Sequence, residues 1–571
     1  MTMVKVGLLF DRAAVEKRFN YGLNVFQLYT EEILAHAGIP FEMVESADRL
    51  SDYKIVIAGI TDDDPETMET LWRFAENGGA LIAYRGLDKM ARKLQCLRSR
   101  PSGVGYMRPD AGTAGGNTDP LRFLQAEVWH PQANDPSTVR AYGTLHADTP
   151  DGRMLGPALL SFRVGRGSIH RWAVDIPTTV VHFQQGSSPV LYDGIPAQDG
   201  TGDVDDSILK VDDRYEMDWE LDRAATETGM LYFRHPYGDY WRDVMIGHLL
   251  RTAREHGWVL PFVDPWPDGV EQVALISFDS DQNRDESAVT TLKLLREMGI
   301  PTTWCLIEPG FSPEICRWAA AEGHELALHY NALAMENGRW SREELHRQYA
   351  YVKQATGFAD IVSNKNHYTR YEGWGELFAW CERHGVQADQ TRGPSKRGNV
   401  GFLFGTCHPY FPIAWFDEQN RIYDVLEIGF LTQDLDLPQW SDTSVIVPFL
   451  ERVRQVEGVA HFLFHQVHIH RNPNVNRAIR QVVEEARRRG FAFWTSAEIN
   501  DWERARRRVV ITGVDEGGAV RAQGTDAADV VVWIPLPEHR SQDGAERKFG
   551  VPCRKVVLNA EKRGVELEGS R

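Results

Sequence analysis

The sequence of 571 residues contains few cysteines, and none of them is paired at short spacing. Its six cysteines are scattered without a Cys-x-x-Cys motif, a pattern typical of reduced thiols in a cytoplasmic protein. The sequence also lacks an apolar run long enough to span a bilayer, and the apolar stretch near its start is too short for a secretory signal. We therefore expect a cytoplasmic protein without a membrane partner.

The sequence also has fewer positively charged than negatively charged residues. The chain has 63 Lys and Arg against 81 Asp and Glu, which gives a net charge of −18. Such a surface repels nucleic acids and anionic membranes, so neither is an expected partner. A small molecule or an oligosaccharide remains as the expected substrate, and a homo-oligomer is compatible with the sequence. The 17 tryptophans serve either core packing or stacking on sugar rings.

Residues 1–185 alternate between predicted strands and helices, which favours a doubly wound parallel sheet. The apolar strand runs lie at 4–10, 41–44, 55–58 and 80–84. This layout resembles the class I glutamine-amidotransferase-like (flavodoxin-like) fold. Active members of that family carry a cysteine on the turn after the strand that ends here in Ala83-Tyr84-Arg85-Gly86, and this chain has none there. We therefore expect a three-layer, non-catalytic domain.

Residues 186–268 are rich in Gly, Asp and Ser at first and then helical near 240–256, which indicates a connecting subdomain. Residues 269–506 again alternate between strands and helices, as expected of a distorted (β/α)7-8 barrel. The candidate strands are 273–279, 302–307, 325–329, 360–363, 386–389, 423–428, 461–465 and 492–495. Residues 507–571 contain short strands with Gly and Pro turns and predict a small β domain.

Polar residues gather at the carboxyl ends of the barrel strands, where barrel enzymes place their chemistry. Asp279 and Asp281 close the first strand and point to the same side, so they repel each other unless a cation or a proton lies between them. A solvated loop would explain this pair alone. The same ends carry further polar residues on other strands, namely Glu308, His329, Asn364, His367, Asp389 and His465.

The order of these motifs resembles the polysaccharide deacetylase family (carbohydrate esterase family four) over residues 270–505. The matching stretches are Ser277-Phe278-Asp279-Ser280-Asp281, Gly323 to His329, and Phe462-Leu463-Phe464-His465. The resemblance implies that Asp279 is the general base, that Asp281 and His329 bind a divalent metal, usually Zn²⁺, and that His465 is the acid. It also implies that the reaction is the hydrolytic removal of an acetyl group.

The chain departs from this family at residue 333. The family carries a second metal histidine four residues after the first, where this sequence has Leu333. Because loops after adjacent barrel strands lie close together, we predict that His367 is the third ligand beside Asp281 and His329. The alternative is that His367 only forms hydrogen bonds in a polar loop.

Further residues at strand ends and in loops are expected to contact substrate. They are Tyr330, Asn331, Tyr368, Trp374, Asp389 and His408. Core packing or hydrogen bonding within the fold is the alternative for each of them.

Together these features predict a metal-dependent hydrolase that removes acetyl groups from an acetylated (amino) sugar or oligosaccharide. One alternative is hydrolysis of a non-sugar C–N bond, as in allantoinase-like relatives of the family. Another is a metal-free sugar-binding or scaffolding protein, which the loss of the histidine at residue 333 favours.

Overall fold

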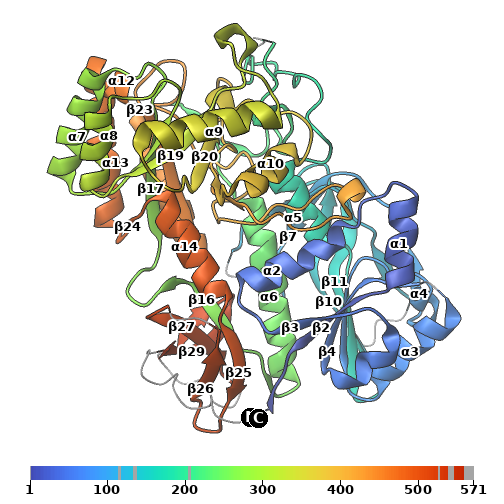
Figure 1. The fold of residues 1–571 in the computed structure, drawn as a ribbon. Coiled ribbons are helices and arrows are strands. Elements are labelled where there is room, and N and C mark those ends of the chain that lie inside the picture. Colours follow the sequence, from blue (N-terminus) through green and yellow to red (C-terminus); the bar gives the residue numbers. More distant parts are fainter. Residues whose placement is uncertain are drawn as a thin grey trace.

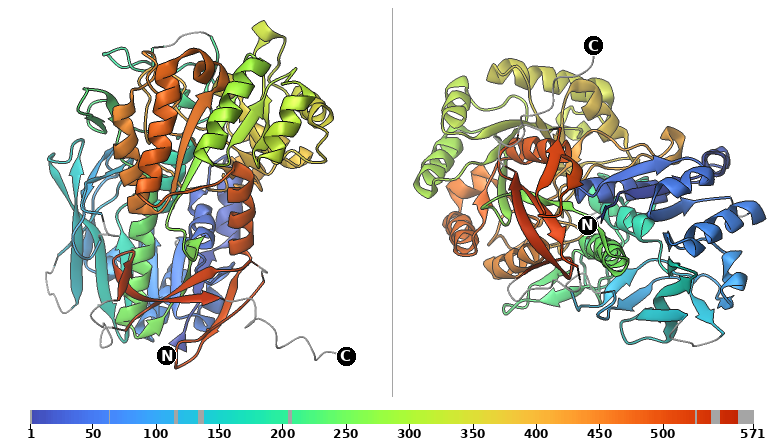
Figure 2. Two further views of the ribbon diagram at one scale, coloured as in Figure 1. Left: turned by 90° about the vertical axis from the view of Figure 1, so that its left-hand side faces the viewer. Right: turned by 90° about the horizontal axis from the view of Figure 1, so that it is seen from below.

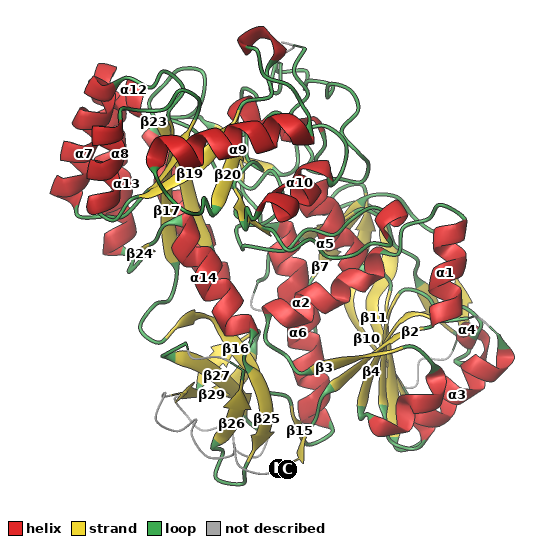
Figure 3. Cartoon of the chain, viewed as in Figure 1, coloured by secondary structure: helices red, strands yellow, loops and turns green. Residues whose placement is uncertain are grey.

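A computed structural model describes residues 2–62, 64–113, 117–132, 138–203, 207–524, 527–537 and 545–558. Three larger β-sheets organise these residues (Figure 1). Helices surround the first two sheets, whereas the strands of the third sheet are joined by turns and loops (Figure 3). Within the described chain, no helix combines the length and the apolar character needed to cross a membrane.

The first sheet is parallel in its first half and antiparallel in its second. Five strands run parallel, namely β3 (Phe41–Val44), β2 (Val6–Phe10), β4 (Ile55–Ile60), β5 (Ala80–Tyr84) and β12 (Gly167–Trp172). The sheet continues antiparallel with β11 (Met154–Val164), β10 (Val139–Ala147), β7 (Gly105–Arg108) and β8 (Leu121–Phe123). In β5, Ile82 belongs to one apolar core and Leu81 to another. Because successive side chains alternate across a strand, both faces are covered, as predicted for a three-layer domain.

The second sheet contains the eight predicted parallel strands. They are β17 (Val273–Asp279), β18 (Thr303–Leu306), β19 (Glu325–Tyr330), β20 (Ser363–Asn366), β21 (Ala388–Asp389), β22 (Leu426–Glu427), β23 (Val459–His465) and β24 (Ala492–Phe493). After β22 the chain returns to β23, where the Leu431 N–H donates to His461 O at 2.9 Å. The sheet is therefore curled into a distorted barrel, and the predicted fold is confirmed.

The third sheet is small and antiparallel, in the order β16 (Phe262–Pro267), β27 (Val530–Pro535), β29 (Val551–Leu558) and β28 (Glu546–Lys548). Its edge strand β16 comes from the segment that we expected to be a connecting subdomain. Helix α14 (Ser496–Arg507) runs from the barrel down to this sheet (Figure 2, left). The domain boundaries drawn from the sequence stay predictions.

Helix α6 (Tyr237–Glu255) lies between the first sheet, the third sheet and the barrel (Figure 1). Its side chains are buried on nearly all sides, and one apolar core extends from the first sheet through this helix into the barrel. Trp241 on α6 is fully buried and donates from Nε1 to Arg122 O at 2.7 Å. The barrel is thus held against the other parts by a shared core.

Replacing Trp241 tests this shared core. We expect Trp241→Ala to lower the free energy of unfolding by about 3–5 kcal/mol, because it leaves a cavity where α6 meets the first sheet. Val447 is 38% exposed on the barrel surface, and Val447→Ala should change the free energy by less than about 0.5 kcal/mol. Urea unfolding followed by circular dichroism measures both variants, and an equally small loss for both would contradict the shared core.

Candidate metal centre

Four strands of the barrel bring polar side chains to one rim. Asp279 ends β17, His329 lies near the end of β19, His367 follows β20 and His465 ends β23. The strands are parallel, and Asp279 lies level with His465 in the β17–β23 register. Since the carboxyl ends of parallel strands meet at the same edge, residues far apart in the sequence converge there.

Asp281, His329 and His367 form the centre of this rim. Asp281 Oδ1 lies 3.3 Å from His329 Nε2, and Asp281 Oδ2 lies 3.7 Å from His367 Nε2. One ligand atom from each residue falls within 4.8 Å of the other two. The structure thus brings together the three residues that the sequence proposed as metal ligands, and their role stays a prediction.

Each imidazole is oriented by an oxygen atom on the side of its ring that faces away from the centre. His329 Nδ1 lies 2.9 Å from Lys365 O, and a carbonyl only accepts, so the proton is on Nδ1 and the lone pair of Nε2 faces the centre. His367 Nδ1 lies 3.4 Å from Glu336 Oε2. A carbonyl or carboxylate behind a histidine is the arrangement that fixes the tautomer of a metal ligand.

The centre fits a divalent cation. Asp281 Oδ1 and His329 Nε2 are buried, and neither has a hydrogen-bond partner among the described residues. Burial alone would raise the pKa of the Asp281 carboxyl, but His465, His329 and His367 outweigh it and hold this pKa well below its usual range. A carboxylate with two neutral imidazoles, which leaves a fourth position open, is a typical donor set for Zn²⁺.

His465 lies beside the centre as a charged group. Its Nε2 is 3.5 Å from Asp281 Oδ2, and its Nδ1 contacts the buried carboxylate of Asp434. Burial would lower the pKa of His465, but the carboxylates of Asp434 and Asp281 outweigh that effect and raise it to about 10. In the metal-free protein His465 therefore carries a proton at neutral pH.

Asp279 is paired with a buried lysine. Lys365 Nζ lies 3.2 Å from Asp279 Oδ1 and donates to Ser277 Oγ at 2.6 Å. Ser277 in turn donates to His461 Nε2 at 2.7 Å, because His461 Nδ1 is committed to Ile428 O. This chain of hydrogen bonds fixes the Lys365 side chain inside the barrel, beside the carboxyl group of Asp279.

Two of the expected substrate residues lie near the centre. The Tyr368 ring is 4.7 Å from the His367 ring, and Tyr368 is 48% exposed. Asn331 donates from its amide to Glu336, the residue behind His367. Of these two, Tyr368 is placed to touch a bound molecule.

Four expected substrate residues contact other parts of the fold, and their role toward a substrate stays a prediction. Tyr330 is buried, and its hydroxyl is used by the backbone near Arg339. Trp374 packs between Phe26 and Trp415, which explains it as a core residue. Asp389 is fully buried and accepts hydrogen bonds from Asn364 and Thr391. His408 lies in a different cavity, 5.0 Å from the ring of His36.

A second group of possible ligands adjoins the centre. Asp434, His465 and His468 also offer ligand atoms within 4.8 Å of one another. The carboxylate of Asp434 already binds His465 through both the side chain and the backbone N–H. We therefore read this group as the support of a protonated His465.

Sequence reasoning missed Asp434, Glu336 and Lys365. Lys365 lies two residues before His367, and side chains two apart on a strand share a side, so this alternation was a usable signal. Asp434 lies in an irregular loop and Glu336 in a single 3-10 turn, Ala334–Glu336, and neither is long enough or regular enough for a period to show which way a side chain points.

No protein-family model and no curated protein matches this chain. Among solved structures, a candidate polysaccharide deacetylase from Mycobacterium smegmatis matches with 18% identity and a TM-score of 0.32, over 42% of this chain and 92% of that one. The Xyl-CE4 domain of a xylanase from the hindgut metagenome of Trinervitermes trinervoides matches with 16% identity and a TM-score of 0.24, over 40% and 90%. The allantoinase Puue matches with 15% identity and a TM-score of 0.30, over 42% and 92%. Similarity at this level does not establish a function, so the function has to be argued from the geometry of the site.

The Asp434 carboxylate should control the titration of His465. In metal-free protein we expect His465 to lose its proton near pH 10, and Asp434→Asn to lower that pKa. Because the folded pKa is raised, the stabilisation by charged His465 is complete below the ordinary pKa of about 6.5 and is lost as the pH rises through about 10. NMR of ¹³C-labelled histidine measures the titration.

A nearby carboxylate provides the matched control. Asp436 accepts from the Thr443 N–H, and Asp436→Asn should leave the His465 titration unchanged. Equal midpoints in the wild type and in Asp434→Asn would contradict the assignment.

Proposed function

We propose that this protein is a metal-dependent hydrolase that removes acetyl groups from an acetylated amino sugar or oligosaccharide. The observation that carries the proposal is the convergence of Asp281, His329 and His367 next to the carboxyl group of Asp279 and a protonated imidazole, His465. These are the groups that hydrolysis of an amide or ester requires: a cation site, a base and an acid.

The residues divide the proton transfers between them. The chemistry that a divalent metal such as Zn²⁺ supplies in such a site is Lewis-acid polarisation of a carbonyl and of water. Asp279, which lies beside Lys365, accepts the proton of the attacking water. His465 donates its Nε2 proton to the leaving nitrogen or oxygen as the bond to the acetyl carbon breaks.

An aromatic side chain at the rim supports a sugar as substrate. Tyr368 is half exposed beside His367, and a tyrosine ring offers a face on which a sugar ring can stack. The φ of +58° at Tyr368 is a conformation that a bulky residue rarely adopts. Such outliers cluster at functional sites.

Metal analysis and product detection test the proposal. We expect about one equivalent of a divalent metal per chain, bound by Asp281, His329 and His367. Acetate should be released from N-acetylated oligosaccharides, and chelation should abolish the release. Hydrolysis of allantoin instead would favour the non-sugar alternative, and protein that binds no metal would favour a sugar-binding protein without activity.

Asp279→Asn should remove the base and spare the metal centre. We expect acetate release to fall by about 10²–10⁴-fold, the usual contribution of a positioned general base, with unchanged metal content. Steady-state kinetics and metal analysis of the same preparation measure both quantities. Activity within about tenfold of the wild type would rule out this role.

His367→Ala should lose metal and activity together, because only Asp281 and His329 would remain as ligands. His470 is exposed on the neighbouring helix α12 (Gln466–Arg471), so His470→Ala is the matched control and should keep both. Metal content after dialysis decides the question. Full occupancy in His367→Ala would show that another residue completes the ligand set.

A further inference from the structure

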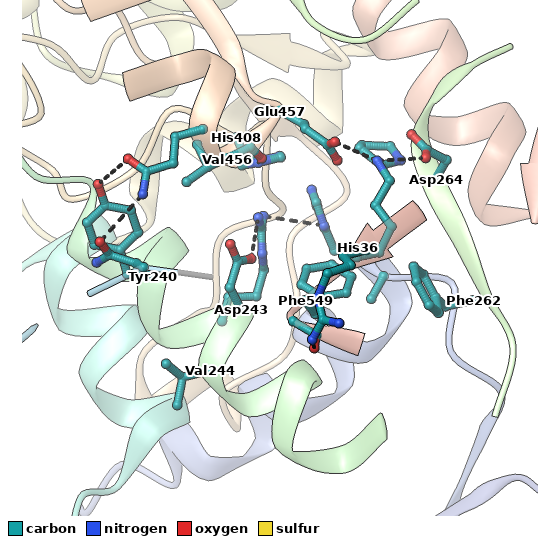
Figure 4. A pocket seen from close by; sticks show the side chains of 18 of the residues that line it. His36, Tyr240, Asp243, Val244, Phe262, Asp264, His408, Val456, Glu457 and Phe549 are labelled. Carbon is teal, nitrogen blue, oxygen red and sulfur yellow. Dashed lines mark hydrogen bonds and ion pairs between the residues drawn. The ribbon is translucent and has the colours of Figure 1, made fainter. Parts of the chain in front are cut away.

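A cavity of about 300 Å³, separate from the metal centre, lies where the three sheets and helix α6 meet (Figure 4). Its walls come from the end of α2 (Thr30–His36), from α6, from β16, from the barrel at residues 455–457 and from the turn at residues 547–550. This volume is in the range of small-molecule sites, which often occur between the parts of a protein. The cavity shares no lining residue with the metal centre.

Three buried polar side chains with unused hydrogen-bonding atoms line this cavity. His36, Arg242 and His408 are each more than nine-tenths buried. Among the described residues, His36 Nε2, Arg242 Nε and His408 Nδ1 have no hydrogen-bond partner. Buried polar groups are nearly always satisfied, so this cluster indicates that something else binds there.

The tautomers of His36 and His408 define which hydrogen-bonding groups a ligand in the cavity must provide. Arg242 Nη1 lies 3.5 Å from His36 Nδ1 and can only donate, so His36 carries its proton on Nε2 as a free donor. His408 Nε2 donates to Val456 O at 2.6 Å, so its Nδ1 is a free acceptor. Burial first, and then the Arg242 charge, lower the pKa of both imidazoles well below the usual range, so both are neutral.

A donor and an acceptor on neighbouring rings favour a hydroxyl group. The two rings are 5.0 Å apart and nearly perpendicular. A hydroxyl accepts from one imidazole and donates to the other, whereas a carboxylate only accepts and an ammonium only donates.

Each buried cation of the cavity wall contacts a carboxyl group, which favours a ligand without a net charge. Arg242 pairs with Asp243 at 3.2 Å, and Lys548 pairs with Asp264 at 3.3 Å and with Glu457. The third cation of the wall, Arg547, is exposed. Burial raises the pKa of Asp243 to about 7, so this carboxyl can also present a donor at neutral pH.

Aromatic side chains complete the wall. Phe262 and Phe549 pack together with their ring centroids 5.4 Å apart, and Tyr240 lies opposite them (Figure 4). Aromatic rings together with mixed donors and acceptors are the surroundings that suit a sugar ring.

We propose that this cavity binds a neutral polyhydroxylated small molecule of monosaccharide size. The site is separate from the metal centre and does not depend on the proposed hydrolase activity. Ordered waters are the competing occupants, because they too accept and donate.

Ligand-observed saturation-transfer NMR on the full chain tests this proposal. D-glucose and D-galactose, which carry no acetyl group, serve as probes, with D-glucuronate and D-glucosamine as charged analogues. We expect transfer to a neutral sugar, weaker transfer to both charged analogues, and unchanged transfer in Asp281→Ala, which removes a proposed metal ligand. Binding that disappears in Asp281→Ala would place the sugar in the metal centre and overturn the proposal.

Two variants locate the binding. Val456→Phe fills part of the cavity, and Val447→Phe makes the same change at an exposed position on the same helix, α11 (Ile446–Val456). We expect the first to abolish transfer and the second to retain it. Phe549→Ala removes a ring from the opposite wall, should weaken binding, and serves if Val456→Phe does not fold. Absence of transfer to every neutral sugar, or transfer that survives both cavity variants, would overturn the proposal.

Discussion

The repulsion between two carboxylates at the end of one strand governs the candidate site. Asp279 and Asp281 leave a strand that is buried along its whole length, so water cannot screen them fully. The fold compensates each one differently. Asp279 faces the ammonium of Lys365, whereas Asp281 faces three imidazole nitrogens and no lysine or arginine among its described partners. A cation held by Asp281 would complete this balance, which explains why the imidazoles converge there.

The neighbours of His465 and Asp279 distinguish the proton donor from the proton acceptor. Carboxylates surround His465, which keeps its proton, whereas the amine of Lys365 lies beside the carboxyl group of Asp279. A protonated imidazole next to a carboxyl group can give and take protons within one reaction. Asp434 and Lys365 are buried, so they contact His465 and Asp279 without contacting a substrate.

Strand periodicity explains what the sequence could predict. Alternation and the parallel order of the strands place Asp279, His329 and His465 at one rim, and the structure confirms these strands. The same reasoning does not separate Tyr330, Trp374, Asp389 and His408 from residues of the core, because proximity to a strand end does not show whether a side chain has a partner inside the fold. Trp374 contacts Phe26, which is hundreds of residues away in the sequence. His408 is held by Val456 and lies next to His36, and no local pattern records such contacts.

The position of His367 makes the metal centre depend on strand pairing. A ligand four residues after His329 would come from the same loop, but residue 333 is a buried leucine. His367 follows the neighbouring strand β20, and the register sets His329 opposite Lys365, whose carbonyl also orients the His329 ring. A shift of β20 by one residue would turn Lys365 to the opposite side and displace His367 with the end of the strand. Base, metal ligand and ring orientation therefore rest on one register, so any change that loosens the β19–β20 pair should disturb all three at once.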